Sequence, residues 1–67
     1  MMVGEKIKNY LNENGIKQTF IADKTGLSNS CISDICGGNR KIEVIEYLKI
    51  CRALGVELDT FLVGEDQ

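Results

Sequence analysis

The three cysteines, Cys31, Cys36 and Cys51, are the side chains of this sequence best suited to covalent or metal chemistry. An odd number of cysteines argues against a disulfide framework. A structural zinc site needs four ligands, usually cysteines and histidines, and the 67 residues include no histidine. We therefore predict neither a metal site nor a cofactor, and we expect the cysteines to act as small apolar side chains.

Catalytic and membrane functions find little support in the sequence. No serine or cysteine has a plausible base beside it, so we expect no enzyme. The apolar runs are only a few residues long, whereas a membrane helix needs about 20. No basic and then apolar leader opens the chain. We expect a cytoplasmic protein with no membrane contact, and no small-molecule ligand is indicated.

Apolar residues recur at helical spacing along the whole chain and predict an all-α protein of five short helices. The length allows one domain, residues 1–67. The helices are expected at about residues 3–14, around 20–22, from Ser28 to about residue 36, over 44–54 and around 58–62.

The fourth of these predicted helices has the widest apolar face. Val44, Tyr47, Leu48, Cys51 and Leu54 form a stripe, which Ile45 and Ile50 widen. Such a wide arc predicts a helix that is contacted on several sides, near the centre of the domain. In the last predicted helix, Leu58, Phe61 and Leu62 are expected to be buried.

The segment from Gln18 to Gly37, QTFIADKTGLSNSCISDICG, has the pattern of two short helices joined by a tight turn. Ala22 is small where the two helices must cross closely. Gly26 follows four residues later, where the chain needs a positive φ. Ile32 and Ile35 are expected to face back onto the first helix. Together these spacings are typical of a helix-turn-helix.

Residues 3–63 resemble a complete Xre-type, lambda-repressor-like helix-turn-helix domain, the family of phage and bacterial repressors and Cro-like proteins. The matching stretches are IKQTFIADKTGLSNSCIS, the glycine at position 37 or 38, and LKICRALGVELDTFL. The last stretch is similar to the family's fourth and fifth helices. The resemblance implies a compact five-helix domain in which helices 2 and 3, within residues 18–37, form the DNA-binding motif.

The resemblance also implies which residues read the DNA sequence. In this family the second helix of the motif, here about residues 28–36, lies in the major groove with its N-terminal side chains on base edges. The positions that match are Ser28, Asn29, Ser30, Asp34 and Gln18. We favour Asn29 for a bidentate contact to adenine. Ser28 is also a good helix cap, so its role can be purely structural.

The residues that the resemblance places near DNA phosphates are Lys17, Gln18, Asn39, Arg40 and Lys41. Phosphate contacts set affinity and register but carry no sequence information. The charge distribution agrees with this assignment: residues 1–42 carry six basic and four acidic side chains, whereas residues 43–67 carry two basic and six acidic ones. Arg40 and Lys41 also fit an ordinary solvated loop.

The sequence departs from the family pattern at several positions. Lys17 stands where a serine or threonine cap is usual, which should cost about 1 kcal/mol at the start of the second helix. Leu11 and Cys36 replace a frequent arginine and a frequent glutamate. If those two normally form a buried ion pair, exchanging both for apolar side chains need not destabilise the fold. We therefore predict that Leu11 and Cys36 touch.

These features predict a sequence-specific DNA-binding transcriptional regulator, a repressor that binds a palindromic operator in double-stranded DNA as a homodimer. The dimer contact is expected at Phe61 and Val63, and the acidic tail, residues 64–67, is expected to stay away from DNA. One alternative is an antitoxin-like or anti-repressor protein-interaction module, which the net charge of −2 and Asp34 favour. Another is thiol sensing through Cys31.

Overall fold

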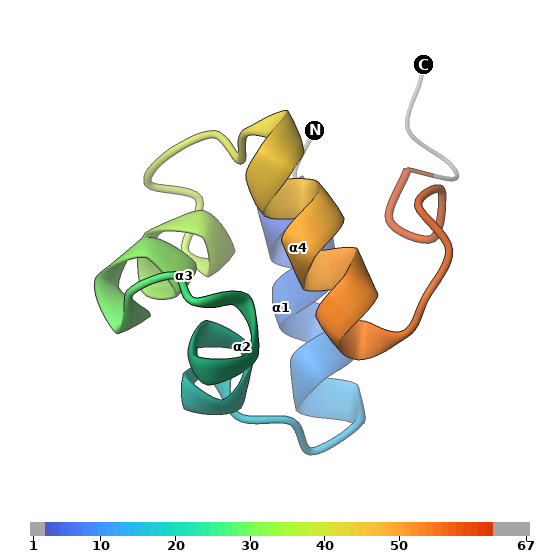
Figure 1. Cartoon of the computed structure of the whole chain (residues 1–67), viewed down its shortest axis with the longest axis horizontal. Helices are drawn as coiled ribbons and strands as arrows, with labels where there is room; N and C mark the ends of the chain where they lie inside the picture. Colours follow the sequence, from blue (N-terminus) through green and yellow to red (C-terminus); the bar gives the residue numbers. More distant parts are fainter. Residues whose placement is uncertain (1–2, 63–67) are drawn as a thin grey trace.

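Four helices make up the computed structural model, which describes residues 3–62 (Figure 1). They are α1 (Val3–Glu13), α2 (Gln18–Thr25), α3 (Asn29–Cys36) and α4 (Val44–Leu54). No strand occurs among the described residues, so the all-α prediction is confirmed. Helix α3 packs against α1 and α2, and α4 packs against α2.

The predicted fifth helix is absent, and residues 58–62 form turns instead. The amide of Leu62 donates to the carbonyl of Asp59 at 3.0 Å, three residues back. In an α-helix it would bond the carbonyl of Leu58, four residues back. That carbonyl accepts a hydrogen bond from the Tyr47 hydroxyl instead. The Leu58 carbonyl, which a further helical turn would need as an acceptor, thus takes part in a tertiary hydrogen bond.

The core lies where the four helices and the final turn meet. Its buried apolar residues are Ile7, Leu11, Ile21, Ala22, Ile32, Ile35, Cys36, Ile50, Cys51 and Phe61. Leu11 and Cys36 are only 1% and 3% exposed, on helices that pack against each other. Both side chains therefore point into the same core, as their predicted contact requires.

Helix α4 is less enclosed than its apolar pattern predicted. Ile50 and Cys51 are buried, but Val44 and Ile45 in its first turn are 78% and 57% exposed. Leu58 and Leu62, which were expected in the core, are 52% and 46% exposed. The prediction of burial was wrong at these positions, and Val44, Leu58 and Leu62 line an open groove between α4 and the final turn.

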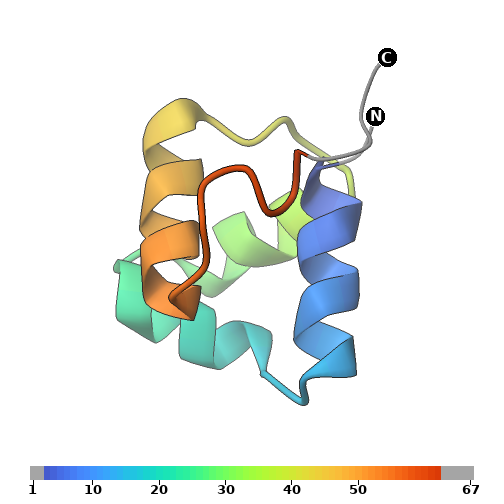
Figure 2. The same ribbon diagram turned by 90° about the vertical axis from the view of Figure 1, so that its right-hand side faces the viewer.

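Phe61 anchors the final turn to the rest of the molecule. Its ring makes edge-to-face contacts with Tyr10 of α1, at a centroid distance of 5.6 Å, and with Tyr47 of α4, at 6.4 Å. Figure 2 shows the final turn lying between these two helices. Phe61 is 3% exposed, so its side chain serves its own core and has little surface to offer a partner. Val63, the other expected dimer contact, lies outside the described residues.

Gly4 allows a close approach of α1 to the end of α3. A Cβ added at Gly4 would lie 2.0 Å from the backbone oxygen of Ile35, well inside any contact distance. The start of α1 therefore supports the C-terminal end of α3 directly through the backbone. Nothing in the sequence signals this contact, because the glycine stands inside an otherwise ordinary helical pattern.

Candidate nucleic-acid interface

The turn between α2 and α3 is built by local hydrogen bonds. Gly26 has a φ of +79°, as predicted, and its amide donates to the carbonyl of Ala22 at 2.9 Å. The hydroxyl of Thr25 donates to the carbonyl of Ile21 at 2.7 Å and accepts from the amide of Leu27 at 3.2 Å. These bonds end α2 and fix the direction in which α3 leaves the turn.

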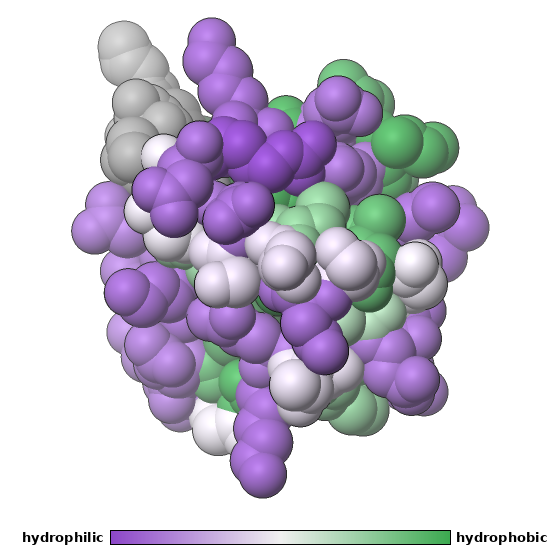
Figure 3. Space-filling view, turned by 90° about the vertical axis from the view of Figure 1, so that its left-hand side faces the viewer, coloured by the Kyte–Doolittle hydropathy of each residue, from purple (hydrophilic) through white to green (hydrophobic). Residues whose placement is uncertain are grey.

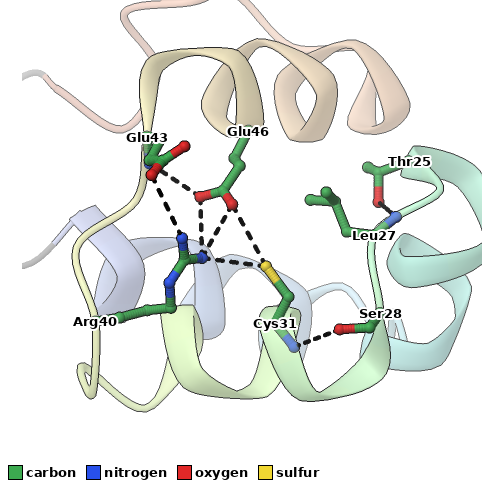
Figure 4. Close-up of polar contacts among 7 residues, drawn as sticks. All are labelled: Thr25, Leu27, Ser28, Cys31, Arg40, Glu43 and Glu46. Carbon is green, nitrogen blue, oxygen red and sulfur yellow. Dashed lines mark hydrogen bonds and ion pairs between the residues drawn. The ribbon is translucent and has the colours of Figure 1, made fainter.

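Helix α3 begins with the serine cap that the sequence predicted. The hydroxyl oxygen of Ser28 accepts from the amide of Cys31 at 3.0 Å (Figure 4). Ser28 is exposed, and its hydroxyl hydrogen remains available as a donor while its oxygen caps the helix. Ser28 can therefore cap α3 and still donate a hydrogen bond to DNA, which is the contact that the resemblance implies.

The outer face of α3 is polar and exposed. Ile32 and Ile35 are buried against the core, whereas Asn29, Ser30 and Asp34 are exposed. Figure 3 shows this side of the molecule, where residues of hydrophilic or intermediate hydropathy cover most of the surface. The final turn lies on the opposite side of the molecule from α3 (Figures 1 and 2), so the described residues leave this face open.

The start of α2 holds two further candidates for contacts to DNA. Gln18 is the first residue of α2 and is half-buried, and Lys17 before it is exposed. Lys17 has an extended backbone and its side chain makes no cap hydrogen bond, as the departure from the family pattern predicted. The first amides of α2 therefore lack a side-chain cap and carry the positive end of the helix dipole.

The three remaining candidates for phosphate contacts lie in the loop after α3 and differ in their surroundings. Of the two glycines that follow α3, Gly38 has a positive φ of +77°. Asn39 and Lys41 are exposed. Arg40 is half-buried and its Nη1 donates to both carboxylate oxygens of Glu46, each at 3.0 Å. Asn39 and Lys41 thus extend into solvent, whereas Arg40 turns toward α4.

Glu46 is a buried carboxylate that the sequence analysis did not single out. Burial alone would raise its pKa, but hydrogen bonds from the Glu43 amide, from Arg40 and from Cys31 outweigh this effect and leave the pKa of Glu46 below its ordinary value. The amide of Glu43 donates to Glu46 at 3.0 Å. The spacing of these two residues, at the cap and third helical position, is that of a capping box and could have identified Glu46 as a capping residue.

Cys31 lies on the inner side of α3, in contact with this charged pair. Burial, followed by the hydrogen bond to Glu46 and the charge of that carboxylate, raises the pKa of the Cys31 thiol. A higher pKa lowers the fraction of reactive thiolate near neutral pH. This environment therefore gives no support to thiol sensing. All three cysteines are free thiols.

Residues 3–62 contain no group of three or more histidine, cysteine or acidic side chains that could hold a metal ion. Over the same residues, no helix is both long and apolar enough to cross a membrane.

The family model described as helix-turn-helix matches residues 7–61 of the chain. A solved structure with a similar fold is that of the restriction-modification controller protein C.AhdI from Aeromonas hydrophila. The two chains share 23% sequence identity with a TM-score of 0.82, over 90% of this chain and 91% of the other. No curated protein sequence matches significantly. The family match and the similar fold thus extend over most of the described residues, including the helix-turn-helix.

Proposed function

Since this chain belongs to the Xre-type, lambda-repressor-like helix-turn-helix family of DNA-binding transcription regulators, we propose that it is a sequence-specific repressor that places α3 in the DNA major groove. The observation that carries the proposal is the exposed polar start of α3, where Asn29 and Ser30 extend from a helix fixed by buried Ile32 and Ile35. Only the major groove is wide enough to admit a helix, and it presents a different pattern of donors and acceptors for each base pair.

Base reading is assigned to Ser28, Asn29, Ser30, Asp34 and Gln18. Asn29 offers an amide that can both donate to and accept from adenine. Asp34 can only accept when ionised, which suits the amino group of cytosine and excludes acceptor edges. The hydroxyl groups of Ser28 and Ser30 can donate or accept, so they add contacts with less discrimination.

Phosphate contacts are assigned to Lys17, Gln18, Asn39 and Lys41. The support is their exposure, or half-exposure for Gln18, at the two ends of the motif. A phosphate beside the first turn of α2 would also meet its uncapped amides and the helix dipole. Arg40 has acidic partners of its own, so we leave it out of this set.

A homodimer on a palindromic operator would give the domain enough base pairs for specificity. The proposed dimer surface is an apolar groove of about 470 Å³ between the first half of α4 and the final turn. Its apolar lining includes Val44, Tyr47, Leu48, Leu58 and Leu62. A palindromic operator would present its two half-sites about 34 Å apart, one for the α3 helix of each domain. Bound across a promoter, the dimer would exclude polymerase by occupancy alone.

Selection of duplexes from a randomised pool, followed by binding measurements on the selected site, tests the function. We expect a defined, two-fold symmetric sequence to be enriched. Asn29→Ala should cost about 1–3 kcal/mol on that site and relax preference at one base pair. Asn9→Ala, an exposed asparagine on α1, is the matched control and should bind as the wild type. Failure to enrich any sequence at low salt would contradict the proposal and favour the protein-interaction module.

A further inference from the structure

Arg40 is the centre of a charged cluster between α3 and α4. Its Nη1 donates to the two carboxylate oxygens of Glu46 and to the sulfur of Cys31, the last at 3.1 Å. Its Nη2 lies 3.9 Å from a carboxylate oxygen of Glu43. The thiol of Cys31 also lies 3.5 Å from Glu46, within hydrogen-bonding distance for sulfur. Figure 4 shows the guanidinium group of Arg40 between these three residues.

The cluster joins the base-reading helix to the rest of the domain. Cys31 is in the first turn of α3, directly after Asn29 and Ser30, and Glu46 is in the first turn of α4. Backbone packing holds α3 mainly against α1 and α2. The contacts of Cys31 and Arg40 with Glu46 therefore add a connection from α4 to the end of α3 that approaches DNA.

Moving Arg40 to a phosphate would leave Glu46 without its cation. Glu46 is only 8% exposed, so losing the cation would leave a poorly solvated negative charge with only the Glu43 amide and the Cys31 thiol as donors among the described residues, which destabilises the fold. The Arg40 side chain is itself one-third exposed, and its charge already faces two carboxylates. A phosphate group approaching this loop would meet those negative charges as well as the guanidinium group.

We propose that Arg40, Glu46 and Cys31 are positioning residues, which fix the direction of α3 relative to α4, and that Arg40 acts on DNA binding through α3 without neutralising a phosphate. The proposal rests on the proposed DNA-binding function and deepens it. In this proposal the DNA-sequence selectivity of α3 depends on Arg40, from the loop after α3, and on Glu46, from α4.

Glu46→Gln distinguishes the two roles of Arg40 by the sign of its effect. If Arg40 positions α3, both Glu46→Gln and Arg40→Gln should lower affinity for the selected duplex by roughly 10-fold, and the double variant should lose little more than either single variant. The slope of log affinity against log salt should stay unchanged. If Arg40 contacts a phosphate, releasing it from Glu46 should raise affinity, and Arg40→Gln should flatten the slope by about 0.9.

Two further variants serve as controls. Lys41→Gln, at the exposed neighbouring cation, should weaken binding to the selected and a scrambled duplex alike and flatten the salt slope by about 0.9. Arg40→Lys keeps the charge, so a phosphate contact would be largely retained. If Arg40 positions α3, Arg40→Lys should lose affinity for the selected duplex only, because lysine does not reproduce the geometry of the guanidinium group.

Thermal unfolding of each variant shows whether it is folded at the assay temperature. If Glu46→Gln is unfolded there, the comparison of Arg40→Lys with the wild type tests the proposal. A flatter salt slope for Arg40→Gln, or tighter binding by Glu46→Gln, would overturn the positioning role and leave the proposed function standing. If the wild type selects no duplex, the proposed function itself fails.

Discussion

Glu46 shows how one buried side chain can link stability to pH. Its folded-state pKa is lowered because Glu43, Arg40 and Cys31 donate hydrogen bonds to the carboxylate and outweigh its burial. A lowered pKa means that the charged form stabilises the fold fully above the ordinary pKa, about 4.5, and that this stabilisation is lost as pH falls through the lower folded value.

We therefore expect the free energy of unfolding to fall below about pH 4.5 with a steeper slope in the wild type than in Glu46→Gln. Urea unfolding between pH 3 and pH 7 measures the difference. Glu13→Gln, at an exposed position on α1, is the comparison variant. Identical pH profiles for the wild type and Glu46→Gln would show that the carboxylate is not held in its charged form by these neighbours.

Tyr47 combines apolar contacts with a hydrogen bond from its hydroxyl group. Burial, followed by the neighbouring Cys51, raises the pKa of Tyr47 to about 12, and the protonated phenol donates to the carbonyl of Leu58. Tyr47→Phe should lower the free energy of unfolding by about 1 kcal/mol, because it leaves that carbonyl without this donor. Chemical denaturation measures the loss. An unchanged stability would indicate that water or the backbone replaces the hydroxyl.

At the scale of elements, the stability of α3 depends on its cap. Ser28→Ala removes the acceptor for the amide of Cys31 and should cost about 1 kcal/mol of unfolding free energy. Ser33→Ala is the matched control, since Ser33 is exposed in the middle of the same helix. A cost at Ser33 equal to that at Ser28 would contradict the capping role.

The motif was readable from the sequence because its signals are local. Gly26 with its positive φ, the cap at Ser28 and the spacing of Ile32 and Ile35 depend on residues within a few positions. The final turn could not be predicted from the sequence. The hydrogen bond from Tyr47 that replaces a helical hydrogen bond joins residues 11 positions apart. The Arg40 cluster was missed for the same reason: a basic loop residue looks solvated until a carboxylate from another helix is placed beside it.

At the scale of the whole molecule, the polar face of α3 and the apolar groove beside α4 lie on different sides. A dimer formed through the groove would therefore leave both α3 helices open to DNA. We expect sedimentation equilibrium to give a dimer at micromolar concentration, and Leu62→Glu to give a folded monomer, because it adds a charge at an apolar residue that is 46% exposed.

Lys49→Glu, at an exposed position farther along α4, is the control for the change of charge and should remain dimeric. A wild type that is monomeric both alone and on the selected duplex would contradict the dimer while leaving DNA binding by a single domain intact.

The outer face of α3 is the part of the molecule proposed to meet DNA. Backbone amide chemical shifts, recorded as the selected duplex is added to the labelled protein, measure this directly. We predict the largest shifts at residues 28–34, with smaller ones at residues 17–18 and 39–41, and little change at residues 57–62. The largest shifts at residues 57–62, with α3 unperturbed, would contradict the assignment of α3 as the helix that reads DNA.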